Sequence, residues 1–139
     1  MCELLPSELD SQLQRDADMT HYEFAVLTFL RWAPDASVSM SEIADATSGS
    51  LSRLSHVCSR LERRGLISRS PSPEDRRVTT VALTGAGRRA LIRAIPGHIE
   101  TARRLVVDAL SEEDLAHLAR ITALLGVQLD PESRFGSPR

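Results

Sequence analysis

Residues 39–65 read SMSEIADATSGSLSRLSHVCSRLERRG, and this stretch constrains the fold more strongly than any other. Ser39 and Glu42 have capping-box spacing, which predicts a helix of about eight residues that ends at the break over residues 47–50. A second helix follows, with apolar side chains spaced to form one narrow buried stripe. They are Leu51, Leu54, Cys58 and Leu61. Gly65 stands where a left-handed C-terminal cap would end this helix, so the pattern predicts a helix-turn-helix.

A small hairpin is predicted directly after Gly65. Residues 66–70 can form one strand, and residues 77–83, which are rich in Val and Thr, can form the other. Pro71-Ser-Pro-Glu-Asp75 supplies the turn, and its two prolines exclude a central strand. The expected result is a protruding two-stranded wing, followed by a helix that Thr84 caps.

The remaining sequence predicts further helices. They run from Ser7 to about Ala17, from Thr20 to near Pro34, from Thr84 to Pro96-Gly97, from His98 onward and from Ser111 onward. Pro96-Gly97 is expected to interrupt its helix, because proline lacks the N–H donor and clashes with the preceding turn. The last two helices carry apolar stripes with few partners in a domain this small, so we expect them to pair with a second copy of the chain.

Together these elements predict a mainly α fold with a small β-hairpin wing. We expect a winged helix-turn-helix domain at residues 20–95 and a helical dimerisation region formed by residues 1–19 and 96–128. Residues 129–139 are polar and contain Pro and Gly, so we expect a disordered tail.

Positive charge is concentrated in one part of the chain. All seventeen basic residues are arginines; residues 51–104 carry twelve of them against four acidic residues, whereas the rest carries five against fifteen. The net charge of −2 hides this asymmetry. It favours a positive face for a polyanion, although a solvated helix surface can carry the same residues.

The outer arc of the helix over residues 50–64 carries side chains suited to DNA. Ser52, Arg53 and His56 would reach base edges in the major groove, where an arginine can donate two hydrogen bonds to a guanine. Contacts to the sugar-phosphate backbone are expected from residues at the start and the rear of the helix. They are Ser48 and Ser50 at the start, and Arg60, Arg63 and Arg64 at the rear.

The wing adds a second contact. An arginine at a narrow strand tip can enter the minor groove, where the potential is most negative. An adjacent carboxylate such as Asp75 can hold the guanidinium of such an arginine in a forked ion pair, which keeps the arginine from folding back.

Several classes of protein are not supported. The chain has no run of 18 apolar residues and no signal-peptide pattern, so we expect a cytoplasmic protein without a membrane span. The four histidines lack zinc-ligand spacing, and neither a phosphate loop nor a nucleophile motif is present, so we expect no metal, no cofactor and no enzymatic activity.

Three segments resemble the MarR family of transcriptional regulators. They are SMSEIADA, SRLSHVCSRLERRGLISRSPSPEDRR and LTGAGRRAL, within a resemblance that covers roughly residues 20–127. The resemblance implies a homodimer that binds a pseudo-palindromic operator on double-stranded DNA, usually as a repressor released by a small phenolic or other hydrophobic effector or by cysteine oxidation. By matching position it implies base contacts by Ser50, Ser52, Arg53 and His56, a wing pair of Asp75 and Arg77, and a phosphate contact by Arg76. The alternative is a winged-helix module for protein assembly that reads no DNA sequence.

A ligand pocket is expected between the winged domain and the helical dimerisation region. Its predicted lining is Tyr22, Phe29, Trp32 and His98, although such aromatic residues are more often part of the core. Cys58 falls on the buried stripe, so we expect a core role for it in preference to redox sensing.

Overall fold

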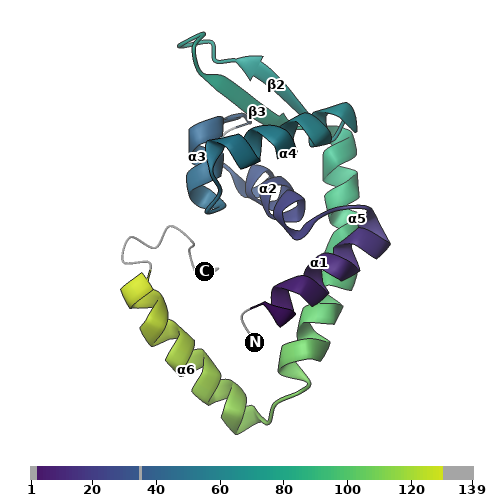
Figure 1. Cartoon of the computed structure of the whole chain (residues 1–139), viewed down its shortest axis with the longest axis vertical. Coiled ribbons are helices and arrows are strands. Elements are labelled where there is room, and N and C mark those ends of the chain that lie inside the picture. Colours follow the sequence, from purple (N-terminus) through teal and green to yellow (C-terminus); the bar gives the residue numbers. More distant parts are fainter. Residues whose placement is uncertain (1–2, 35, 130–139) are drawn as a thin grey trace.

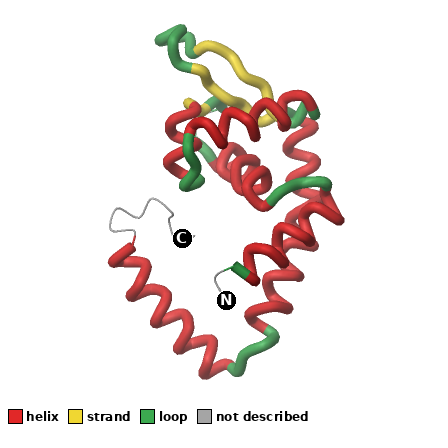
Figure 2. The backbone as a smooth tube through the Cα atoms, in the orientation of Figure 1, coloured by secondary structure: helices red, strands yellow, loops and turns green. Residues whose placement is uncertain are grey.

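A computed structural model describes residues 3–34 and 36–129 of the 139-residue chain. The described part is mainly helical with one small antiparallel sheet, which confirms the predicted fold class (Figures 1 and 2). In chain order the elements are α1 (Leu4–Ala17), α2 (His21–Trp32), β1 (Val38–Ser39), α3 (Met40–Ala46), α4 (Leu51–Arg63), β2 (Ile67–Pro71), β3 (Thr79–Leu83), α5 (Gly85–Ala102), the π-helical turn η1 (Arg103–Val107) and α6 (Glu112–Leu129).

Local capping signals decide where the helices begin. The Thr20 hydroxyl accepts the Glu23 N–H at 3.1 Å while the Glu23 carboxylate accepts the Thr20 N–H at 2.8 Å, which completes the predicted capping box of α2. Ser39 and Glu42 form the same box at the start of α3. Gly65 has φ +69° just after α4, so the predicted left-handed cap is also confirmed.

The sheet has three strands in the order β1-β3-β2, one more than predicted. Strand β1 pairs Val38 with Val81, but it is only two residues long and its Ser39 also caps α3, so no alternating pattern announces it. In the wing, β2 lies at the sheet edge, where the missing N–H of Pro71 is tolerated.

A single hydrophobic core joins α2, α3, α4, the sheet and α5. Leu54, Cys58 and Leu61 of α4 are fully buried in it, as predicted. Leu51 is 54% exposed, so the prediction that it belongs to the stripe is wrong. Leu51 is the first residue of α4 and directly follows the turn. Because no helical turn precedes it, its side chain is not packed against the core.

The predicted interruption at Pro96-Gly97 is wrong, because α5 runs through both residues. Helix α1 packs along α5 at this point: a Cβ added to Gly97 would lie 3.3 Å from Nε2 of Gln12, and Oε1 of Gln12 lies 3.2 Å from Nδ1 of His98. We attribute the continuity of α5 to these contacts with α1, since they lie directly beside the turn in which Pro96 removes one helical hydrogen bond. Helix α1 itself starts one turn before the predicted Ser7, because Pro6 is tolerated in a first helical turn.

Helix α6 diverges from α1 and α5 and leaves an open V (Figure 1). In the described residues it has no buried side chain; Leu115 is half-buried, and the large apolar side chains from Leu118 to Leu129 are 39–82% exposed. Of the tail predicted at residues 129–139, Leu129 ends α6 and the rest lies outside the described residues. Helix α5 crosses the predicted boundary at residues 95 and 96, so the division into two regions remains a prediction. Within residues 3–34 and 36–129, no helix is long and apolar enough to cross a membrane.

Candidate nucleic-acid interface

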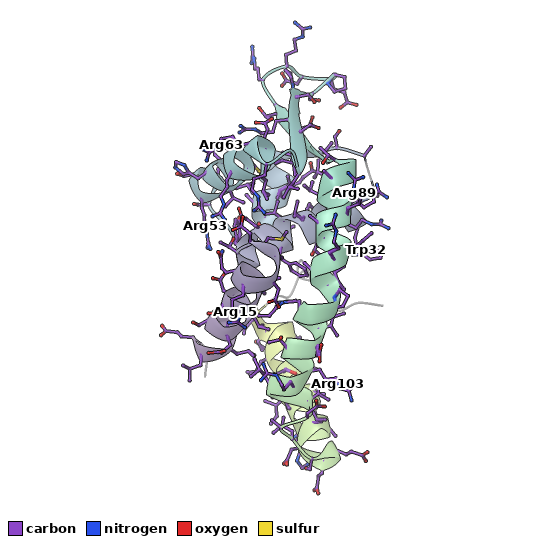
Figure 3. The ribbon with its side chains drawn as sticks, turned by 90° about the vertical axis from the view of Figure 1, so that its right-hand side faces the viewer. Arg15, Trp32, Arg53, Arg63, Arg89 and Arg103 are labelled. Atoms are coloured by element: carbon purple, nitrogen blue, oxygen red, sulfur yellow. The ribbon has the colours of Figure 1, made fainter. Side chains whose placement is uncertain are left out.

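Helix α4 lies at the surface beneath the wing and presents a polar outer arc (Figure 1). Ser52, Arg53 and His56 are all exposed on this arc. Ser50 caps the helix: its hydroxyl accepts the Arg53 N–H at 3.2 Å, which leaves the hydroxyl proton available to a phosphate. Arg53 and Arg63 lie on one side of the molecule, and Trp32 and Arg89 lie on the other (Figure 3).

The structure gives Arg60 a different partner from the predicted phosphate. Its Nε lies 3.1 Å from Oε1 of Glu23, whose side chain is only 1% exposed. The contact is an ion pair without hydrogen-bond alignment, since Oε1 has no hydrogen-bond partner, whereas Oε2 accepts from Thr20. The guanidinium therefore neutralises a buried carboxylate of α2 and ties α4 to the core.

Replacing Arg60 with alanine is expected to lower the free energy of unfolding by about 1–3 kcal/mol, because the Glu23 carboxylate stays buried without a cation. Urea denaturation measures the effect. Arg63→Ala is the matched control: Arg63 is exposed and, within the described part of the chain, its side chain donates only to the Ser59 carbonyl of its own helix, at 3.3 Å. Equal stability of the two variants would contradict a structural role for the Arg60–Glu23 pair.

A second ion pair, which the sequence did not suggest, docks the wing on α4. Arg69 of β2 donates to the Glu62 carboxylate from Nε at 2.9 Å and from Nη2 at 2.6 Å. These hydrogen bonds hold the pKa of Glu62 below its usual range. Arg64, another predicted contact to the DNA backbone, donates instead to the Asp18 carbonyl at 2.7 Å, so both ends of the α4–β2 connection are held.

The wing tip differs from the predicted forked pair. The Asp75 carboxylate accepts the backbone N–H of Arg77 at 3.0 Å, and the ion pairs of the described residues do not include the Arg77 guanidinium. An aspartate carboxylate that accepts the backbone N–H of the residue two positions later forms an Asx turn. The Asp75 carboxylate is therefore bonded within its own turn. The Val78 N–H donates to the Asp75 carbonyl at 2.9 Å, which closes the tip further. The side chains of Arg76 and Arg77 are left exposed.

The base of the wing is locked by the residues of the Leu-Thr-Gly-Ala-Gly stretch. The Thr84 hydroxyl donates to the Gly65 carbonyl at 2.7 Å and accepts the Gly87 N–H at 3.0 Å. The Thr84 N–H donates to the Leu66 carbonyl at 3.1 Å. A Cβ at residue 87 would overlap that same carbonyl oxygen, so glycine alone permits this approach of α5 to Leu66, the residue before β2.

The four residues predicted to line a ligand pocket are not brought together. Tyr22 and Trp32 lie at opposite ends of α2, about 15 Å apart along its axis. Phe29 packs against the core, whereas Trp32 is 72% exposed beside Arg31. His98 packs on Phe24, and burial followed by the nearby His21 lowers its pKa.

An apolar groove lies elsewhere, in the V between α6 and the α1–α5 pair. Its volume is about 530 Å³. The lining consists of Leu4, Leu5, Glu8, Leu105, Val106, Ala109, Leu110, Leu118 and Thr122. Its lining contains no aromatic residue, whereas the pocket predicted from the sequence was defined by aromatic side chains.

Cys58 has the expected core role. Its side chain is fully buried, and burial raises the pKa of the thiol to about 11, so the nucleophilic thiolate is scarce at neutral pH. Cys2 lies outside the described residues. Among residues 3–34 and 36–129, no three His, Cys, Asp or Glu side chains gather in a way that could hold a metal ion.

The structure thus has a surface helix capped by Ser50, a neighbouring wing and exposed arginines on both. These features define a winged helix-turn-helix protein. The chain belongs to the MarR family, whose profile matches residues 19–79. Sco3205, a MarR family transcriptional regulator from Streptomyces coelicolor solved in complex with DNA, is 37% identical, with a TM-score of 0.84 over 94% of this chain and 81% of Sco3205. This family membership confirms the resemblance and agrees with the expectation that the protein is not an enzyme.

Curated relatives carry the same kind of name. The HTH-type transcriptional regulator PecS of Dickeya dadantii is 37% identical over 106 residues, which are 75% of this chain and 61% of PecS. YdcH of Bacillus subtilis, an uncharacterized HTH-type transcriptional regulator, is 31% identical over 57% of this chain. The match spans only 55% of YdcH.

Proposed function

We propose that this MarR family regulator binds DNA sequence-specifically, as a homodimer on a pseudo-palindromic operator. The observation that carries the proposal is the exposed Ser52–Arg53–His56 arc of α4 beside a wing whose tip presents Arg76 and Arg77. Hydroxyl, guanidinium and imidazole groups are donors and acceptors that can read base edges, whereas a protein-assembly surface would favour apolar anchors. The DNA complex of Sco3205 supports this choice.

Roles within the interface follow from the contacts. Ser52, Arg53 and His56 would read bases, since none of them belongs to an ion pair of the described residues. The predicted phosphate contacts are Ser50, Arg63, Arg76 and Arg77, with Asp75 shaping the wing turn. Arg60 is assigned to Glu23 instead.

The overall test is selection of bound sequences from a randomised duplex library, followed by titration at two salt concentrations. A recovered pseudo-palindrome bound at least about a hundredfold more tightly than random duplex, with a steep salt slope, is the expected result. Equal binding of all sequences would overturn the proposal and favour the protein-assembly alternative.

Arg53→Ala is expected to weaken operator binding by about 1–3 kcal/mol and to relax the preference at one base pair per half-site, because a forked guanine contact is lost. Competition binding against operator variants at each position measures both effects. The assignment fails if affinity for random duplex drops by the same factor as affinity for the operator.

Arg77→Ala is expected to act without regard to sequence. Loss of one phosphate contact should lower the magnitude of the salt slope by about one unit per dimer half and weaken all duplexes alike. Titration from low to high salt gives the slope. A slope equal to that of the wild type would place Arg77 outside the contact surface.

The homodimer is proposed from the exposed face of α6 that lies outside the groove. An 18-residue helix without a buried side chain in the described chain leaves a continuous apolar surface that a second copy would cover. Two-fold symmetry would then set two α4 helices against successive major grooves, about 34–36 Å apart.

Repression released by a small hydrophobic or phenolic effector completes the proposal. The apolar groove between α1, η1 and α6 supports it, since its volume of about 530 Å³ is in the range of small-molecule pockets. We place the effector there in preference to the Tyr22, Phe29, Trp32 and His98 set. Addition of phenol to the protein–operator complex should raise the dissociation constant, and Leu105→Arg in the groove should remove that response. A response that survives Leu105→Arg would place the effector elsewhere.

A further inference from the structure

Tyr22 and Arg53 make a contact that neither the fold nor the family assignment requires. The guanidinium carbon of Arg53 lies 4.2 Å from the centre of the Tyr22 ring. Tyr22 comes from the first turn of α2, and Arg53 comes from the first turn of α4, 31 residues later. A cation over an aromatic face is attracted by the ring electrons.

The Tyr22 ring is itself held rigidly beneath the turn of the helix-turn-helix. Its hydroxyl lies 3.0 Å from the Thr47 hydroxyl, which donates its own proton to the Ile43 carbonyl at 2.7 Å. Tyr22 is therefore the donor in the first contact. A Cβ added to Gly49 would overlap the Tyr22 hydroxyl, so the backbone of the turn packs directly on the phenol. With the ring only 9% exposed, its position is determined by the core and the turn together.

Among the described residues, Arg53 has no competing acid partner. The four ion pairs of the described residues leave its guanidinium out, and Ser50 bonds only its backbone N–H. A free arginine side chain samples many rotamers, and fixing one of them at the DNA surface carries an entropic penalty. Stacking on a ring face restricts these rotamers while the N–H groups at the edge of the guanidinium stay free to donate.

We propose that Tyr22 is a positioning residue for DNA reading, which holds the guanidinium of Arg53 at the start of α4 in an orientation suited to a base edge. The inference rests on the proposed function, because it concerns how one predicted base reader is aimed. Tyr22 is buried and does not contact DNA in this scheme. It determines the specificity of the contact at one base pair rather than the overall affinity.

The test applies library selection and competition binding to wild type, Tyr22→Leu and Tyr22→Phe. Leucine fills the core without an aromatic face, so we expect the preference at the base pair read by Arg53 to fall by about 3- to 10-fold while affinity for random duplex stays unchanged. Phenylalanine keeps the ring and loses only the Thr47 bond, so it should restore the preference to within about twofold of wild type. In an Arg53→Ala background, Tyr22→Leu should have no further effect on that base pair.

The measurement distinguishes a change in the orientation of Arg53 from a change in stability. A variant that is merely less stable binds all sequences more weakly, whereas a misoriented Arg53 side chain alters the preference at one base pair only. A wild type that prefers the operator together with a Tyr22→Leu variant that keeps the same preference profile would overturn the role of Tyr22 alone. A wild type that binds all duplexes equally would overturn the proposed function and this inference with it.

Discussion

Leu125→Glu on α6 is expected to abolish the proposed homodimer and to reduce operator affinity by at least about a hundredfold, because the second half-site is no longer bound by a linked protomer. Leu125 is 54% exposed in the described chain, so the fold of the protomer does not depend on it. In a dimer the same position would be covered, and a carboxylate buried there without a partner opposes association. Sedimentation equilibrium and operator titration on one sample measure both effects.

The matched control is Ala123→Glu. It adds the same charge to the same helix two residues away, which is about 200° around the axis and so nearly opposite Leu125. Residue 123 is also exposed. We expect this variant to stay dimeric and to bind the operator as the wild type does. A dimeric Leu125→Glu protein would show that the subunit interface lies away from this face of α6.

Gly87→Ala is expected to destabilise the winged domain by about 3 kcal/mol or more, because the new methyl group overlaps the Leu66 carbonyl oxygen, a backbone atom that has no rotamer to move. The Leu66 backbone and α5 must separate to admit it, which also strains the Thr84 bonds to Gly65 and Leu66. Operator binding should fall in parallel as the wing loses its base.

Gly85→Ala provides the comparison for that experiment. It lies two residues earlier in the same helical turn, and its added Cβ would meet only the mobile end of Arg89 at 3.5 Å. Alanine is the better helix former, so this variant should match the wild type or exceed it by up to about 1 kcal/mol. Chemical denaturation of both variants decides the question; similar midpoints for the two would mean that α5 and Leu66 are not closely packed.

Signals that act over three or four residues were predictable from the sequence. The capping residues Thr20, Ser39 and Thr84 and the left-handed Gly65 each work through backbone groups close in the chain, so their spacing alone indicates where an element starts or stops. The stripe of α4 from Leu54 onward follows from helical periodicity in the same way. Helix-turn-helix and wing are both assembled from such local signals.

Contacts between distant elements were not predictable in this way. The Arg60–Glu23 pair joins residues 37 positions apart, and it changes the interpretation of Arg60 from a phosphate contact to a structural cation. Strand β1 exists only because β3 is there to pair with it. Helix α5 continues through Pro96 because α1 lies against it. Each of these depends on tertiary placement, which one sequence does not specify.

The same distinction applies to the candidate site. The sequence indicates which side chains of α4 face outward, since that follows from helical geometry. It does not indicate that Asp75 bonds backbone instead of guanidinium, or that Tyr22 lies under Arg53. Exposed residues were thus easier to assign than the buried ones that orient them.

The unbroken α5 has a mechanical consequence for a dimer. Its 18 residues form a helix about 27 Å long. The helix is hydrogen-bonded to the wing base through Thr84 at one end and continues into η1 at the other. A tilt of only about 10° at the lower end would swing the upper end by about 5 Å. That displacement exceeds the rise of one base pair, about 3.4 Å. In a dimer, a small rotation between the two α5 helices would therefore move α4 and the wing out of register with the DNA grooves.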